Sequence, residues 1–66
     1  MLKVEIERED DERWIAEIPS LPGVLAYGET QMDAVARAQA LALRVLAERL
    51  EQGEAVPDLA GLFQAA

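Results

Sequence analysis

The sequence predicts an α+β fold, a two-layer domain in which one long helix packs on one face of a three- or four-stranded, mostly antiparallel sheet. Two segments near the N-terminus alternate apolar and polar residues, as half-buried strands do. A proline-rich turn follows, and then a long run of good helix formers without glycine or proline. The 66 residues suffice for a single domain, which we place at residues 1–66 in the order β-β-β-α-β.

The first strand is predicted at residues 2–8, where apolar and charged residues alternate. Its apolar side chains should share one face, and its acidic ones should point outward. The apolar residues are Leu2, Val4 and Ile6, and the acidic ones are Glu5 and Glu7.

The second strand is predicted at residues 13–19, after a turn of four acidic residues. Strand, polar turn and strand together predict an antiparallel hairpin. Trp14, Ala16 and Ile18 fall on one face, and Glu17 falls on the other. Because Trp14 shares a face with Ile18, we favour a core position under the helix over a role as an interface anchor.

A turn interrupts the sheet after the second strand. Its prolines fix the φ angle and lack a donor N–H, and its glycine can adopt positive φ. A third strand then fits residues 24–27, and Gly28 ends it. The turn residues are Pro19, Leu21, Pro22 and Gly23.

Thr30 marks the start of a helix predicted at residues 31–52. Thr30 and Asp33 have the spacing of a capping box, with Asp in place of the usual Glu or Gln. Gly53 supplies the end of the helix. The apolar residues cover an arc of roughly 200°, whereas a helix on one sheet needs a stripe little more than 100° wide.

The wide apolar arc predicts a homodimer. The free energy gained by burying a core of this size only about balances the conformational entropy lost on folding, so packing against a second copy would supply stability. The candidate interface residues on the helix flank are Leu43 and Leu50. After the helix we expect a short extended or helical tail at residues 54–66, in which Leu62 and Phe63 are further candidates for the interface.

The composition limits the classes of partner. Hydrophobic residues make up 52% of the chain and charged residues 29%, which is typical of a folded protein. The net charge of -7 has the wrong sign for a nucleic acid backbone or an anionic membrane, and it favours a basic protein as partner. Without a signal-peptide-like or membrane-spanning run, we expect a soluble cytoplasmic protein.

The residue types argue against catalysis. The chain has no Cys and no His, so we expect no metal or cofactor site and no enzymatic activity. No histidine can activate the hydroxyl groups of Ser20 or Thr30, and a helix cap explains Thr30. Adjacent acids in a flexible turn, such as Asp10 and Asp11, rarely hold a metal ion.

The acidic turn and one aromatic residue are the candidate partner-binding residues. Together with the outward acids of the two strands, the turn would form a field of negative charge that faces a basic protein. The alternative is a solvated hairpin tip that prevents aggregation. The candidates are Glu9, Asp10, Asp11, Glu12 and Tyr27, the last at a strand end.

The order and spacing of these signals resemble the HicB-like antitoxin family over roughly residues 2–58. The chain departs from the family pattern at Met32-Asp33, where members usually have two acids, and at Leu59, where a second proline is frequent. The matching positions are Trp14 on the second strand, the turn residues Pro19, Leu21, Pro22 and Gly23, and the helix entry Gly28, Glu29 and Thr30.

The resemblance implies a partly RNase H-like arrangement and an antitoxin that binds and masks a small basic HicA-type toxin, an mRNA-cleaving RNase. Many family members add a DNA-binding segment; the residues after the helix here are too few for one, so we expect no DNA-binding activity of its own. The alternative is a stand-alone homodimeric domain with a different partner or none. A nuclease is a third possibility, but it would need several converging carboxylates, whereas the strand acids here point outward.

Overall fold

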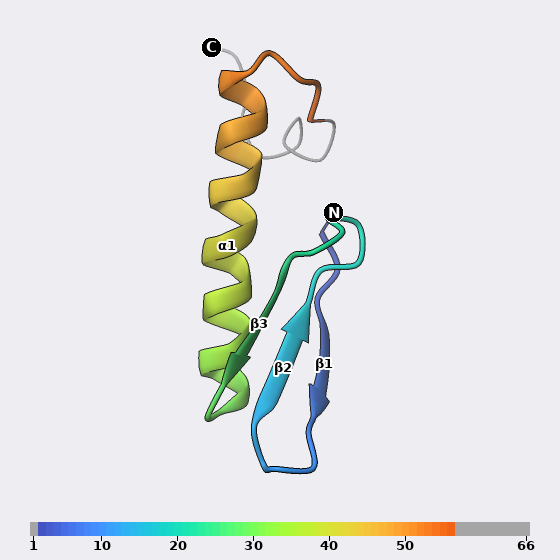
Figure 1. Cartoon of the computed structure of the whole chain (residues 1–66), viewed down its shortest axis with the longest axis vertical. Helices are drawn as coiled ribbons and strands as arrows, with labels where there is room; N and C mark the ends of the chain where they lie inside the picture. Colours follow the sequence, from blue (N-terminus) through green and yellow to red (C-terminus); the bar gives the residue numbers. More distant parts are fainter. Residues whose placement is uncertain (1, 57–66) are drawn as a thin grey trace.

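The computed structural model describes residues 2–56, which form a three-stranded antiparallel sheet and one helix (Figure 1). The strands are β1 (Glu5–Arg8), β2 (Trp14–Glu17) and β3 (Leu25–Gly28), in the spatial order β1-β2-β3. Helix α1 (Gln31–Glu51) runs along the sheet and packs on β2 and β3. The α+β class, the antiparallel hairpin and the single long helix are therefore confirmed.

The strands are shorter than the predicted segments because each strand ends where its hydrogen-bonded pairing with a neighbouring strand ends. Residues 2–4 precede the pairing of β1 with β2, although Leu2 and Val4 still contact the core. The sequence predicts that the chain after the helix is extended or begins a short fourth strand, and residues 54–56 form no strand. The remainder of the predicted tail, with Leu62 and Phe63, lies outside the described residues.

The register of the sheet divides its side chains between two faces. On the inner face, toward α1, Ile6, Ala16 and Ala26 lie opposite one another across the three strands. Trp14 is half-buried on the same face and contacts a cluster of buried alanines, Ala16, Ala34 and Ala38, between the sheet and the helix. The position under the helix that the sequence favours for Trp14 is the one it occupies.

Alanine side chains bring α1 close to the sheet. Ala16 of β2 and Ala34 and Ala38 of α1 are fully buried against one another. A second cluster lies further along the helix and includes Ile18 and Leu46. Ile6 stays 39% exposed although it points to the inner face, because α1 is centred over the other two strands.

The turn between β2 and β3 contributes two buried side chains to the second cluster. Its Leu21 and Val24 side chains are buried, whereas Pro19, Pro22 and Gly23 are exposed. The Ile18 N–H donates to the Val24 carbonyl over 3.0 Å, and the Leu21 N–H donates to the Ile18 carbonyl over 2.9 Å. The turn therefore continues the core beyond the end of the ladder.

Both ends of α1 have the expected caps. The Thr30 hydroxyl oxygen accepts a hydrogen bond from the Asp33 N–H over 3.0 Å, which satisfies one donor of the first turn. At the other end Gly53 has a φ of +80°, in the left-handed region that ends many helices. The helix ends at Glu51, one residue before the predicted boundary, which is within the usual spread of helix ends.

Gly28 allows β3 to meet the first turn of α1. A Cβ atom at this position would lie 2.9 Å from Ala34 Cα and would collide with the Ala34 backbone nitrogen. The neighbouring atoms belong mostly to backbone and cannot move aside without shifting the helix. The close packing therefore leaves room only for glycine at this position.

We expect Gly28→Ala to lower the free energy of unfolding by about 1–3 kcal/mol, because the added methyl group forces α1 away from the sheet. Urea denaturation followed by the fluorescence of Trp14 measures the change. Gly53→Asn is the matched control, since open space surrounds Gly53 and asparagine tolerates its backbone conformation. Equal stability of Gly28→Ala and the wild type would contradict the close contact.

Candidate functional site

The outer face of the sheet, opposite α1, is the candidate site. Its side chains form two rows across the strands. In one row Glu7, Ile15 and Tyr27 lie opposite one another. In the other row Glu5, Glu17 and Leu25 do so.

The carboxylates of this face gather around a shallow depression of about 570 Å³ along β1 and β2. Glu5 and Glu17 are direct partners across the antiparallel ladder, where like charges destabilise a sheet. The surface therefore concentrates negative charge at a cost to the fold. The lining residues on the outer face are Glu5, Glu7, Ile15 and Glu17, joined by Glu9 after β1 and by Ile6, whose strand forms the edge of the sheet.

The hairpin tip that joins β1 and β2 continues this face, but it carries both negative and positive charges. Asp11 Oδ2 accepts a hydrogen bond from Arg13 Nε over 2.6 Å, and Arg8 Nη2 lies 3.7 Å from Glu12 Oε1. The turn is closed by the Glu9 N–H, which donates to the Arg13 carbonyl over 2.7 Å. Arginines within the chain thus partly neutralise the tip.

The backbone of the tip holds two of its acids in fixed positions. Glu12 has a φ of +69°, which is uncommon for a residue with a side chain. The Arg13 backbone N–H donates to Asp11 Oδ1 over 3.2 Å. This hydrogen bond, together with the guanidinium of Arg13, lowers the pKa of the Asp11 carboxyl below its ordinary value.

Tyr27 connects the tip with the outer face. The Arg13 guanidinium lies over the Tyr27 ring, 4.6 Å from its centroid, in a cation–π contact. A second depression of about 370 Å³ is lined by Tyr27, Arg13 and three acids of the tip, Glu9, Asp10 and Asp11. The structure therefore brings together most of the candidate residues that the sequence indicates.

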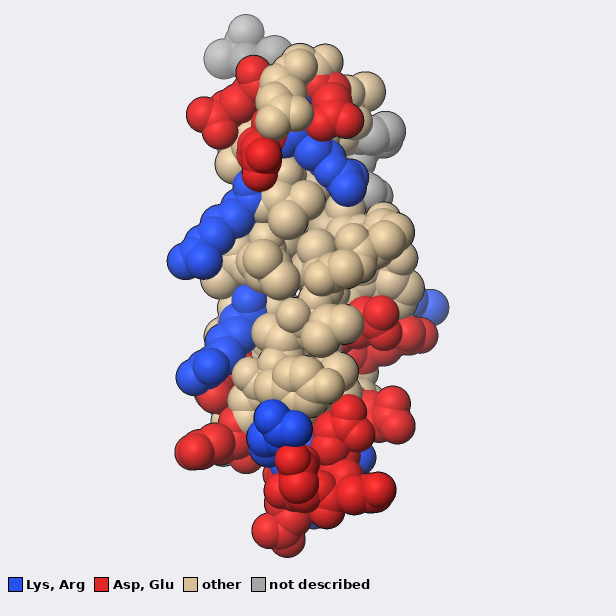
Figure 2. Space-filling model, in the orientation of Figure 1, with Lys and Arg blue, Asp and Glu red and all other residues tan. Residues whose placement is uncertain are grey.

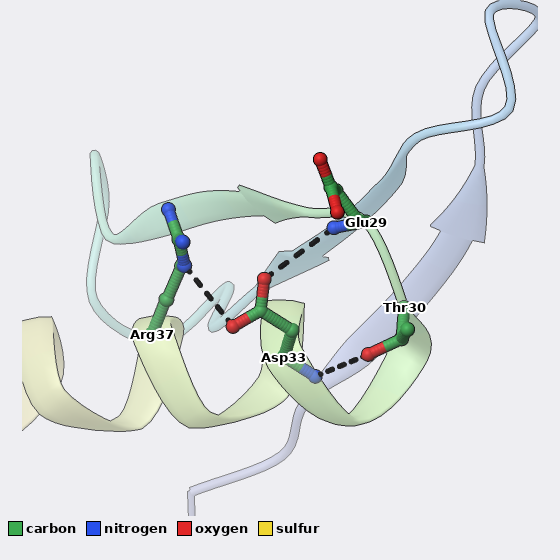
Figure 3. A network of polar contacts seen from close by, with 4 residues as sticks. All are labelled: Glu29, Thr30, Asp33 and Arg37. Carbon is green, nitrogen blue, oxygen red and sulfur yellow. Dashed lines mark hydrogen bonds and ion pairs between the residues drawn. The ribbon is translucent and has the colours of Figure 1, made fainter.

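A polar network at the entry to α1 borders Tyr27 (Figure 3). The Asp33 carboxylate accepts hydrogen bonds from the Glu29 N–H over 3.4 Å and from Arg37 Nε over 3.2 Å. Figure 3 shows Asp33 between these two donors, one turn of helix from Arg37. Because its groups are mutually satisfied, the network holds β3 to the start of α1.

Sequence reasoning missed Arg13 and Ile15 as parts of the candidate site. Ile15 lies at an outward position of β2, where the alternation predicts a polar residue. This departure from the pattern is the signal in the sequence that an apolar side chain lies among the outward acids. The pairing of Arg13 with Asp11 depends on the shape of the turn. Leu43 and Leu50, the candidate dimer residues, are exposed on α1, which packs on the other face of the sheet from this site.

No protein-family model matches the chain, and no curated protein and no solved structure is significantly similar to it. Within residues 2–56, no group of three or more His, Cys, Asp or Glu side chains is arranged to hold a metal ion. No helix in this part of the chain combines the length and the apolar composition that crossing a membrane requires.

The lowered pKa of Asp11 can be tested by NMR titration of its carboxyl carbon. We expect Arg13→Gln to raise that pKa only part of the way to its ordinary value, because the backbone hydrogen bond at residue 13 remains. A folded-state pKa below the unfolded one stabilises the fold above the unfolded pKa, and this contribution disappears as the pH falls through the folded pKa.

Lys3→Gln is the control for this titration, because it also removes one positive charge but lies before β1, away from the tip. It should leave the Asp11 titration unchanged. An Asp11 pKa at or above its ordinary value in the wild type would show that the hydrogen bonds of the turn do not form.

Proposed function

We propose that this protein is a binding module that masks a small basic protein, in the way that HicB-like antitoxins mask HicA-type toxins that cleave mRNA. The observation that carries the proposal is the pairing of Glu5 with Glu17 on an open sheet face beside further carboxylates. Like charges at facing positions of a ladder weaken the fold, and a basic partner would relieve the repulsion.

The charge of the whole chain supports the same partner class. With a net charge of -7, the protein attracts a basic surface over distances of about one Debye length, near 8–10 Å at physiological salt. A toxin that binds RNA needs a positive surface, and an acidic face placed against it competes with the phosphate backbone. The proposed inhibition is therefore steric and electrostatic.

The outer face also offers apolar contacts that a charge pair alone lacks. Leu25 and Tyr27 of β3 are partly exposed there, next to the half-buried Ile15 of β2. Tyrosine is enriched among the residues that dominate binding energy, and its ring here is held in place by Arg13. We propose these side chains as the centre of the contact and the surrounding acids as its rim.

The proposal includes a partly RNase H-like arrangement of the sheet and helix, as the resemblance to HicB-like antitoxins implies. It includes no catalytic role, because the strand acids lie in rows along a ladder and the chain has no histidine to act as a general base. The proposed place of action is the cytoplasm, where an mRNA-cleaving toxin meets its substrate.

The alternative function is that of a stand-alone homodimeric domain with a different partner or none. The exposed side chains of Leu43 and Leu50 favour self-association, and this property is compatible with either function. The two functions differ in whether a basic protein binds the acidic face.

A pull-down of the tagged full-length chain from its native lysate, at low and at moderate salt, separates these functions. We expect a small basic protein in stoichiometric amount whose cleavage of RNA is suppressed by the chain, and weaker capture at the higher salt. Recovery of the chain alone at both salt concentrations would favour the stand-alone domain.

Glu17→Lys tests the acidic face itself, because it places a positive charge opposite Glu5. We expect the free energy of unfolding to rise by about 0.2–1 kcal/mol and the affinity for the basic partner to fall at least about tenfold. Urea denaturation and calorimetric titration measure the two effects. An increase in stability together with a loss of binding would show that the repulsion serves the partner.

Glu51→Lys is the matched control, since it makes the same change of charge at an exposed position near the end of α1. It should weaken binding by less than about threefold through the long-range field alone. Equal loss of affinity in the two variants would mean that net charge, and not the outer face, governs binding.

A further inference from the structure

The inner face of β1 is not covered by the helix of its own chain. A helix with its side chains is about 10–12 Å across and strands lie about 4.8 Å apart, so one helix covers about two strands. Since α1 is centred over β2 and β3, a groove of about 250 Å³ remains between α1 and the start of the chain. Its lining residues are Leu2, Val4, Ile18, Gln39, Ala42 and Leu43.

The flank of α1 that borders this groove carries no charge. Its large apolar side chains are exposed to 82% at Met32, 60% at Leu43 and 51% at Leu50. Ala36 and Ala47 lie on the same flank at helical spacing, whereas the opposite flank carries charged residues such as Arg37 and Arg44. In the view of Figure 2, acidic side chains gather mainly toward the two ends of the molecule, and basic side chains project along one edge between them.

We propose that the helix of a second copy of this chain lies in this groove, beside α1 and over the inner face of β1. The two helices would then form a middle layer between two sheets, related by a twofold axis. In an antiparallel arrangement, Met32 of one copy faces Leu50 of the other, and the two Leu43 side chains lie near the axis. The same surface thus serves on both copies, as a twofold interface requires.

The uncharged flank is long enough to take a second helix. Met32 and Leu50, which are both exposed, lie about 27 Å apart along the axis of α1 at a rise of about 1.5 Å per residue. Ile6, which the sheet leaves exposed, would be covered by the second helix.

Charge also favours a second copy on this surface. Two chains that each carry a net charge of -7 repel each other, so they can associate closely only through a region without acidic groups. The uncharged flank is such a region. The outer sheet faces would then lie on the two outsides of the dimer, so the dimer would leave both acidic faces open and does not depend on the function proposed for them.

Sedimentation equilibrium of the full chain at micromolar concentration tests the proposal. We expect a dimer, and we expect Leu43→Glu to raise its Kd by about 100-fold or more, because each dimer would bury two unpaired carboxylates. Arg44→Glu is the matched control: it changes the charge more, but on the charged flank, and should change the Kd by less than about threefold. Circular dichroism verifies that both variants are folded.

Chemical crosslinking locates the interface independently. Because the chain has no cysteine, a single Gln39→Cys substitution gives one thiol beside the proposed axis, and Arg44→Cys gives one thiol away from it. A short bismaleimide should join two copies of Gln39→Cys rapidly and those of Arg44→Cys slowly. A monomeric wild type, a Leu43→Glu variant that remains dimeric, or equal crosslinking of the two cysteine variants would overturn the proposal.

Discussion

The close contact between α1 and the sheet at Ala16, Ala34 and Ala38 is the constraint on which the remaining structure depends. Three small, fully buried side chains allow the helix backbone to approach the strands, and Gly28 allows the same approach at the helix entry. Dispersion contacts become strong only at such short separations. Larger residues at this seam would lift α1 from the sheet and open both apolar clusters.

The position of that seam determines which surfaces remain open. Because the alanines lie over β2 and β3, the inner face of β1 projects beyond the helix, and the apolar flank of α1 faces the gap. The outer face of the sheet has no covering layer within residues 2–56. A chain of 66 residues therefore presents two chemically distinct surfaces on opposite sides, one uncharged and one acidic.

Local sequence patterns predict the elements of this fold well, and they predict less of how the elements combine. Thr30 and Gly53 mark the helix ends because capping depends on residues close in sequence. Alternation correctly assigns Ile6 to the inner face and Glu17 to the outer one. Alternation cannot show that α1 leaves Ile6 exposed, since this depends on where small residues on different elements meet.

In the candidate site, too, the sequence predicts local features but not the contacts between elements. Its acids and Tyr27 can be found from the sequence, because charged turns and outward strand positions have local signals. The pairing of Glu5 with Glu17 requires the register of the hairpin, and the partial neutralisation of the tip requires the geometry that places Arg13 beside Asp11. Neither follows from composition or periodicity.

The hairpin of β1 and β2 tolerates two separate local costs, and both lie on the acidic surface. Glu12 adopts a positive φ that glycine or asparagine would adopt more readily, and Glu5 faces Glu17 across the ladder. The two costs are connected through the turn, whose backbone conformation fixes the register. A shift of β2 by one residue relative to β1 would separate the two acids. It would also turn Ala16 away from the helix and place a larger side chain against the alanines of α1. The packing of α1 thus enforces a register that the charges alone would oppose, so that the core of the protein holds its acidic face in place.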